Sequence, residues 1–104
     1  METIFKKSHT PNVLNSIGSF GACFDMTQLI QSYQQPVLVN SMDGVGTKTL
    51  FVPTVLPLDK AWFQLGQDLV NHCINDILVM AAKPLFFLDY YGTSMLDGEQ
   101  FQAF

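Results

Sequence analysis

The sequence predicts an α+β fold, because two different patterns of apolar residues occur along the chain. Residues 36–42 and 85–91 are short apolar runs with β-branched or aromatic members, a composition typical of strands. Between them the apolar residues recur about every four positions, which is typical of an amphipathic helix. With 104 residues, the chain is long enough for one small domain.

The first half of the chain is predicted to contain an arm and two strands. Residues 1–16 are polar, so we expect a flexible N-terminal arm, followed by an incomplete domain over residues 17–104. The first strand begins at Pro36, since proline is tolerated at the start of a strand. Residues 49–55 are again apolar and β-branched, which indicates a second strand at a sheet edge.

The second half is predicted to contain a long helix, a strand and the start of another helix. The long helix extends from Leu65 to about Pro84, because the residue before a proline disfavours the helical region. Residues 85–91 follow as a bulky strand, and Asp97 then has the position of a helix N-cap. The apolar face of the long helix is formed by Leu65, Leu69, Cys73 and Ile77.

Composition excludes several classes of protein. Hydrophobic residues make up 48% of the chain, which excludes a disordered tail. Charged residues make up only 13%, so we expect one face to be covered by another chain or by missing sequence. A net charge of −4 without any arginine argues against nucleic-acid binding. No apolar run is long enough for a signal peptide or a membrane helix, and two cysteines do not make a disulfide framework, so we expect a cytoplasmic protein.

Residues 43–48, with the sequence DGVGTK, carry the clearest chemical signal. Gly44 and Gly46 allow backbone N–H groups to converge on an anion. Thr47 adds a hydroxyl and Lys48 a positive charge suited to a phosphate, while Asp43 is a candidate Mg²⁺ ligand. The structural alternative is a glycine-rich hairpin whose charged side chains are solvated.

Three further polar positions are candidates for the same site. Asp76, preceded by Asn75 on the polar side of the long helix, would complete a divalent-metal site with Asp43; a solvated helix surface is the alternative. His72 lies one turn earlier and is a candidate base or ligand, or an ordinary surface residue. Asp89 ends an otherwise apolar strand, where an unpaired acid is costly, so it indicates a ligand site or a structural pairing.

Taken in order, these motifs resemble one enzyme family. DGVGTK at 43–48, CINDIL at 73–78 and PLFFLDYY at 84–91 resemble the N-terminal part of phosphoribosylformylglycinamidine cyclo-ligases, also called aminoimidazole ribonucleotide synthetases. SFG at 19–21 is similar to the Gly-Phe-Gly loop of that family, and the resemblance covers about residues 17–97. The C-terminal domain of the family is absent, so we expect a segment of a larger protein.

The resemblance implies a fold and a reaction. Its members build a mixed or antiparallel sheet packed by helices, and two subunits pair their sheets into a shared β-barrel. They use ATP and Mg²⁺ in purine biosynthesis to activate formylglycinamidine ribonucleotide and to close the imidazole ring of aminoimidazole ribonucleotide. We therefore expect a homodimer that binds ATP and this ribonucleotide, while the 104-residue chain alone is expected to be inactive.

The resemblance also implies roles for individual residues. Departures from the family occur at residues 81–84, where Ala-Ala-Lys-Pro replaces Gly-Ala-Glu-Pro, and at residues 71–72, where Asn-His replaces Ala-Met. At residues 40–44, Asn-Ser-Met-Asp-Gly replaces Ser-Gly-Thr-Asp-Gly. The implied roles are metal ligation by Asp43 and Asp76, ATP binding by Gly44, Gly46, Thr47, Lys48 and Asn75, and catalysis by Lys48 and Asp89.

Two alternative functions fit the same sequence. A shortened relative would keep nucleotide binding and dimerisation but lack turnover. A piece of a sister ATP-using enzyme, such as selenophosphate synthetase, is the other alternative, and residues 84–91 argue against it.

Overall fold

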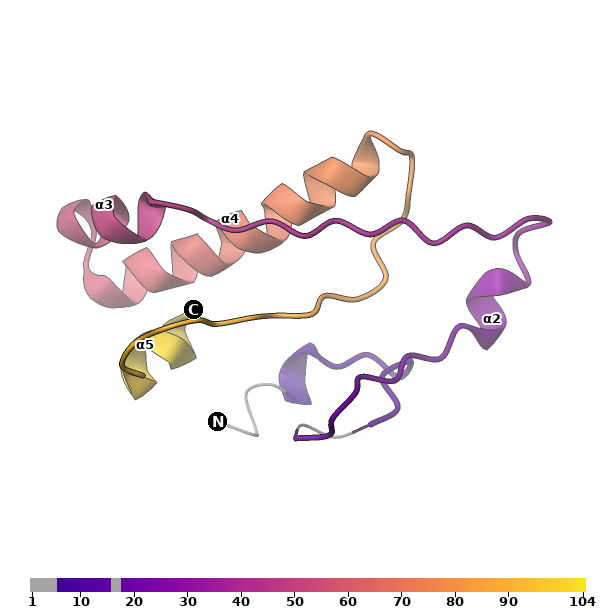
Figure 1. The fold of residues 1–104 in the computed structure, drawn as a ribbon, viewed down its shortest axis with the longest axis horizontal. Coiled ribbons are helices and arrows are strands. Elements are labelled where there is room, and N and C mark those ends of the chain that lie inside the picture. The colour runs from indigo at the N-terminus through magenta and orange to yellow at the C-terminus, as the bar shows by residue number, and fades with distance from the viewer. Residues whose placement is uncertain (1–5, 16–17) are drawn as a thin grey trace. The chain divides into compact units, whose positions relative to one another are not determined.

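A computed structural model describes residues 6–15 and 18–104 of the chain (Figure 1). Contacts divide the chain into two compact units, Met1–Leu38 and Val39–Phe104. The predicted boundary between the arm and the domain, at residues 16 and 17, lies outside the described residues, so the arm stays a prediction.

The first unit is held by local backbone contacts. Residues 6–8 are helical, and Val13 forms an isolated antiparallel bridge with Phe24. Next to this bridge, the Asp25 amide donates to the carbonyl of Asn12 over 2.7 Å. The short helix α2 (Thr27–Ile30) follows, and its first amide donates to the Asp25 carboxylate. The bridge thus closes a loop that leads into α2.

The second unit is built around one long helix. Helix α4 (Leu58–Leu78) packs against α3 (Lys48–Val55) and α5 (Gly98–Ala103). Two segments are extended: residues 39–45 lead into α3, and residues 82–93 connect α4 to α5 (Figure 1).

The core of this unit lies on the predicted apolar face of α4. Ala61 and Leu65 are fully buried, and Leu69 and Cys73 are each 8% exposed. Side chains four residues apart lie on one face of a helix, so these four form a continuous stripe. The prediction of an apolar helix face through Leu65, Leu69 and Cys73 is confirmed, although the helix begins earlier, at Leu58.

Helix α5 is fixed to α4 by aromatic contacts and by a close backbone approach. Tyr91 packs edge-on against Phe101 and Phe104, with ring centroids 4.9 and 5.4 Å apart, and Trp62 of α4 lies 6.5 Å from Phe104. A Cβ atom on Gly66 would lie 3.3 Å from the carbonyl carbon of Phe104 and closer still to its oxygen. Glycine at position 66 therefore allows the end of α5 to lie directly on α4.

The N-terminus of α5 and the C-terminus of α4 are both capped. The Asp97 carboxylate accepts hydrogen bonds from the amides of Glu99 and Gln100, so its predicted N-cap role is confirmed. At the end of α4, the Ala82 amide donates to Ile77 and the Ala81 amide to Leu78, which is the Schellman arrangement. Ala81 has a φ of 54°, a left-handed conformation usually filled by glycine.

The predicted fold class is wrong for this structure. Instead of a mixed or antiparallel sheet that pairs into a shared barrel, the described residues contain helices and one isolated bridge. Residues 36–42 and 85–91 are extended, but no ladder joins them, and a strand is stable only when a neighbour completes its hydrogen bonds. Residues 49–55 form α3, because a helix makes its backbone hydrogen bonds locally and needs no partner.

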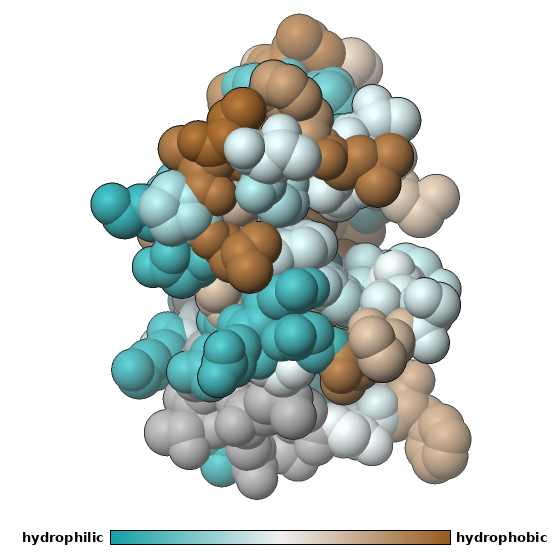
Figure 2. All heavy atoms as spheres, turned by 90° about the vertical axis from the view of Figure 1, so that its left-hand side faces the viewer, coloured by the Kyte–Doolittle hydropathy of each residue, from teal (hydrophilic) through white to brown (hydrophobic). Residues whose placement is uncertain are grey.

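Many large apolar side chains of the second unit remain exposed. Figure 2 shows apolar atoms gathered in the upper part of the face that carries α3. Clusters of exposed apolar side chains often mark interaction sites. The large exposed apolar residues from α3 to the start of α4 are Leu50, Phe51, Val55, Leu56, Leu58 and Phe63.

None of the helices in the described part of the chain combines the length and apolar character needed to cross a membrane.

Candidate functional site

The candidate site forms where an extended segment crosses the polar face of α4. Asp68, His72 and Asp76 are spaced four residues apart on α4, so their side chains lie on one face of the helix. Residues 41–45, which include the start of the glycine-rich motif, are extended and face this row. The site therefore joins two motifs that are about thirty residues apart in sequence, since Asp43 and His72 are separated by 29 positions.

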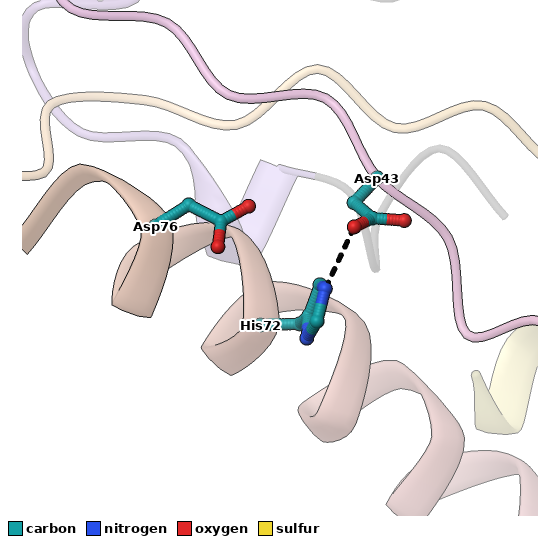
Figure 3. Close-up of side chains that lie close together, drawn as sticks. All are labelled: Asp43, His72 and Asp76. Atoms are coloured by element: carbon teal, nitrogen blue, oxygen red, sulfur yellow. Dashed lines mark hydrogen bonds and ion pairs between the residues drawn. The ribbon is translucent and has the colours of Figure 1, made fainter.

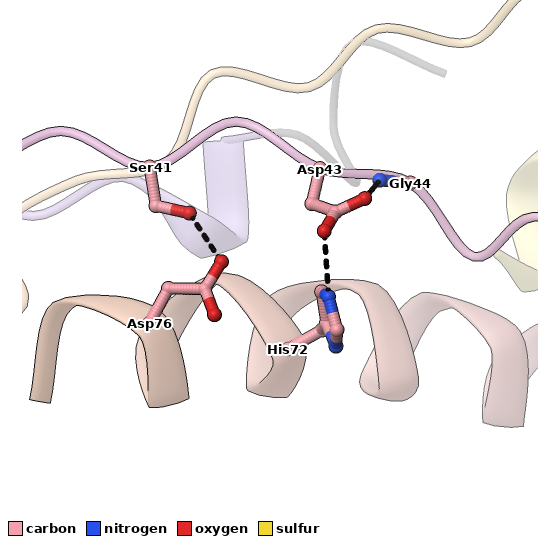
Figure 4. Close-up of polar contacts among 5 residues, drawn as sticks. All are labelled: Ser41, Asp43, Gly44, His72 and Asp76. Carbon is pink, nitrogen blue, oxygen red and sulfur yellow. Dashed lines mark hydrogen bonds and ion pairs between the residues drawn. The ribbon is translucent and has the colours of Figure 1, made fainter. Parts of the chain in front are cut away.

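Two structural periods bring these side chains into register (Figure 4). Four residues of a helix advance about 6 Å, and two residues of an extended chain advance about 6.6 Å. The Ser41 hydroxyl therefore reaches Asp76, to which it donates over 2.8 Å, while Asp43 reaches His72, with Oδ2 and Nε2 2.7 Å apart. The two segments run in opposite directions, since the later residue of one pairs with the earlier residue of the other.

Asp43, His72 and Asp76 form one cluster of potential metal ligands (Figure 3). One ligand atom from each side chain lies within 4.8 Å of the other two, and all three residues are exposed. The Gly44 amide, which donates to Asp43 over 2.6 Å, and then the His72 imidazole hold the pKa of the Asp43 carboxyl below its usual range. Asp43 is thus kept as a carboxylate, the form that binds a cation.

The rest of the glycine-rich motif forms a turn at the start of α3. Gly46 has a φ of 61°, which the absence of a Cβ permits, and Thr47 is the residue before the first residue of α3. Lys48 is that first residue, and its ammonium group lies 3.0 Å from the carboxylate of Asp68 on α4. A turn of this kind presents the first amides of a helix to one side, as phosphate-binding turns do.

Asp68 connects this turn to the polar row on α4. The Gln64 side-chain amide donates to Asp68 over 3.1 Å, and together with Lys48 it holds the pKa of the Asp68 carboxyl below its usual range. Together with Ser41–Asp76 and Asp43–His72, the Lys48–Asp68 pair gives three polar contacts between residues 41–48 and α4. We call these three contacts the polar ladder.

A groove of about 600 Å³ lies beside the polar ladder. Asp43 and Gly44 line it from one side, and Asp89 and Tyr91 line it from another. Burial raises the pKa of the Asp89 carboxyl, against a smaller opposing effect of the Tyr90 amide. Trp62 also lines the groove, and its indole Nε1 is buried without a partner among the described residues.

The structure brings together most of the predicted site residues. Asp43 and Asp76 share the cluster, Asn75 lies exposed on α4 directly before Asp76, and Asp89 lines the same groove as Asp43. The glycine-rich turn adjoins this groove through Gly44, whereas the Lys48 side chain is bound to Asp68 and not to the cluster.

Sequence reasoning missed two residues and left a third undecided. Ser41 and Asp68 were not predicted to belong to the site, although they hold Asp76 and Lys48. His72 was predicted only as a candidate base or ligand. The signal that finds Asp68 and His72 is the row of polar residues at a spacing of four, which runs beside the apolar row of α4, since residues three or four apart are neighbours on a helix.

The donor set fits a divalent cation beside a phosphate group. Two carboxylates on facing segments are the protein ligands that Mg²⁺ uses together with phosphate oxygens. The left-handed Gly46 and the amides at the start of α3 suit an anion placed next to that ion. These residues could therefore hold a divalent cation and a phosphate group side by side.

Comparison with known proteins gives consistent matches. Residues 24–104 match the family model described as AIR synthase related protein, N-terminal domain. The chain is 48% identical over 99 residues to the phosphoribosylformylglycinamidine cyclo-ligase of Thermoanaerobacter pseudethanolicus, covering 95% of this chain and 27% of that protein. It is 43% identical over 97 residues to the protein of the same name from Xanthomonas campestris pv. campestris strain B100, covering 93% and 26%. The predicted resemblance is confirmed, and the chain spans about a quarter of these relatives.

Proposed function

The chain belongs to the AIR synthase related protein family, N-terminal domain, and we propose that it is the metal- and nucleotide-binding segment of a phosphoribosylformylglycinamidine cyclo-ligase. In this proposal the whole protein uses ATP and Mg²⁺ to convert formylglycinamidine ribonucleotide into aminoimidazole ribonucleotide. The identity of 43–48% over nearly the whole chain supports the link to relatives of that name.

One structural observation carries the proposal for this segment. Asp43, from the glycine-rich motif, and Asp76, from α4, place ligand atoms within 4.8 Å although 33 residues separate them in sequence. Carboxylates repel one another when they lie close together, so such an arrangement is favourable when a cation lies between them. The glycine-rich turn next to Asp43 then supplies the anion-binding side of the same site.

Each residue of the site has a distinct task in this proposal. Asp43 and Asp76 hold the Mg²⁺ ion, and the amides of residues 44–47 hold phosphate oxygens. Lys48 leaves Asp68 to contact a phosphate, since an exposed ion pair of this type contributes about 1 kcal/mol or less and is easily exchanged. Asn75 and Asp89 line the site, where Asp89 offers a carboxyl with a raised pKa to the substrate side of the groove.

These tasks together match what phosphoryl transfer requires of a protein. A Mg²⁺ ion held by Asp43 and Asp76 would neutralise charge that develops on the transferred phosphoryl group. The protein positions the nucleotide and excludes water, and little covalent chemistry falls to its side chains. The groove beside the polar ladder is the part of this chain that can hold the reacting groups.

The proposal is tested by measuring nucleotide binding to the chain with and without Mg²⁺. Trp62 is the only tryptophan and lines the groove, so its fluorescence reports binding directly. We expect ATP to change this fluorescence in the presence of Mg²⁺, and we expect Asp43→Asn and Asp76→Asn to weaken the Mg²⁺-dependent affinity by about tenfold or more, because each removes an anionic ligand.

Asp59→Asn is the matched control for these variants. Asp59 is an exposed aspartate in the first turn of the same helix and does not belong to the cluster. We expect this variant to bind Mg²⁺ and ATP as the unaltered chain does. Equal Mg²⁺ dependence in the control and in both cluster variants would rule out the metal assignment.

A further inference from the structure

His72 is the one member of the cluster that offers a nitrogen atom as a metal ligand, whereas Asp43 and Asp76 offer oxygen atoms. We propose that the site formed by Asp43, His72 and Asp76 binds a divalent first-row transition-metal ion such as Mn²⁺ in preference to Mg²⁺, with the His72 imidazole as a direct ligand. The inference rests on the proposed function for the purpose of the site, and it specifies the ion.

The geometry of the cluster allows one ion to contact all three side chains. Metal ions of this size lie about 2.0–2.2 Å from nitrogen and oxygen ligands, so two ligand atoms on one ion are about 3–4 Å apart. The potential ligand atoms of the cluster lie within 4.8 Å of one another, and His72 Nε2 and Asp43 Oδ2 are already 2.7 Å apart. All three side chains are exposed, so they are free to turn toward a common ion.

The positions of the ligands are fixed by their surroundings. His72 and Asp76 are one turn apart on a 21-residue helix, which sets the distance between their backbones. Each carboxylate has one oxygen held by a donor from the extended segment, since the Ser41 hydroxyl donates to Asp76 Oδ2 and the Gly44 amide to Asp43 Oδ1 (Figure 4). Such outer hydrogen bonds orient metal ligands and typically change metal affinity by about 10–100-fold.

Ligand chemistry then separates the candidate ions. Mg²⁺ is bound through oxygen and keeps much of its water, so an imidazole adds little to its affinity. Mn²⁺, Fe²⁺, Co²⁺ and Zn²⁺ accept imidazole nitrogen together with carboxylate oxygen. A site with two carboxylates and one imidazole therefore gains affinity for these ions from His72, whereas its affinity for Mg²⁺ depends on Asp43 and Asp76 alone.

The test measures binding of the metal alone to the untagged 104-residue chain. Mn²⁺ is the principal probe, because its free and bound forms are distinguished by electron paramagnetic resonance. Cysteine sulfur, which Cys23 and Cys73 offer, is also a poor ligand for Mn²⁺. Mg²⁺ affinity is obtained from competition with Mn²⁺. The variant is His72→Gln, which keeps good helix propensity and a polar side chain but removes the imidazole. His9→Gln is the control, since His9 is the other histidine and lies outside the cluster.

We expect His72→Gln to lower Mn²⁺ affinity by about tenfold or more and to change Mg²⁺ affinity by no more than about twofold. The unaltered chain and His9→Gln should show electron spin echo modulation from a directly bound imidazole nitrogen, and His72→Gln should lose it. Unchanged Mn²⁺ affinity in His72→Gln, or no nitrogen modulation in the unaltered chain, would overturn the inference.

These results are independent of the test for the proposed function. If Mn²⁺ binds through His72 but no ion promotes ATP binding, the proposed function fails and the metal assignment stands. If ATP binding depends on Mg²⁺ through Asp43 and Asp76 while His72→Gln changes neither metal affinity, the proposed function stands and this inference fails.

Discussion

Replacing Gly66 with alanine is expected to weaken the packing of α5 on α4. The new Cβ would lie 3.3 Å from the Phe104 carbonyl carbon, 3.7 Å from its Cα and closest to its carbonyl oxygen. The obstacle is the backbone of Phe104 at the end of α5, so this end has to shift to make room for the methyl group. Such a movement disturbs the contacts of Phe104 with Tyr91 and Trp62.

The size of the effect follows from two opposing contributions. Introducing an extra methyl group into a tightly packed place costs about 1–3 kcal/mol, and each disturbed aromatic pair contributes about 0.5–1.5 kcal/mol. Alanine in a helix interior recovers about 1 kcal/mol relative to glycine. We therefore expect a net loss of about 1–5 kcal/mol in the free energy of unfolding of Gly66→Ala.

Urea unfolding followed by circular dichroism and by Trp62 fluorescence measures this loss. Trp62 lies 6.5 Å from Phe104, so its emission should shift to longer wavelength in Gly66→Ala as α5 withdraws. Gly98→Ala is the matched control, because Gly98 is the first residue of α5 and a Cβ there meets nothing within 4 Å. A Gly66→Ala chain as stable as the unaltered protein, with unchanged emission, would show that α5 does not lie on Gly66.

Three further predictions concern a cap, a carboxyl group and the exposed surface. Ala81→Gly should raise the free energy of unfolding by about 0.5–1 kcal/mol, because φ of 54° strains alanine, whereas Ala82→Gly should lower it; the same urea titration checks both. Burial raises the pKa of Asp89 in the folded state, so ionised Asp89 destabilises the fold at pH values above that pKa, and this cost disappears as the pH falls below the pKa of the unfolded state. Asp89→Asn should therefore be more stable than the unaltered chain at pH 7 but not near pH 3. Equal differences in stability at the two pH values would contradict this. The chain should self-associate at micromolar concentration through its exposed apolar side chains, and a sharp monomer boundary in sedimentation velocity would refute that expectation.

The parts of the fold that sequence predicted well are those set by local contacts. The apolar face of α4 and the Asp97 cap depend on residues within one or two turns of helix, and both are found in the structure. The sheet depends on pairing between segments distant in sequence, which composition cannot establish. Residues 49–55 show the difference most clearly, since β-branched Thr49, Val52 and Val55 favour a strand but lie in α3.

Some residues of the candidate site were predicted from the sequence, but their contacts were not. The glycine-rich motif and Asp76 were identified by the chemistry that their residue types can perform. The Lys48–Asp68 pair was not, because a long flexible side chain can reach several acidic partners and the sequence does not say which. The Gln64 side chain also donates a hydrogen bond to Asp68, so the role of Asp68 is evident only when the whole polar row on α4 is considered.

The polar ladder explains how the site can form where the predicted sheet does not. A sheet requires backbone groups of several strands to pair along their length, and a missing partner leaves a whole row unpaired. The ladder requires only that residues 41–45 stay extended beside one helix, because about 6.6 Å for two extended residues matches about 6 Å for one helical turn. The match ends at Gly46, where a φ of 61° turns the chain, and only the long side chain of Lys48 still reaches α4 at Asp68. The glycine-rich turn therefore has two roles. It presents the amides at the start of α3, and it directs the chain away from α4 directly after Asp43 has reached His72 and Asp76.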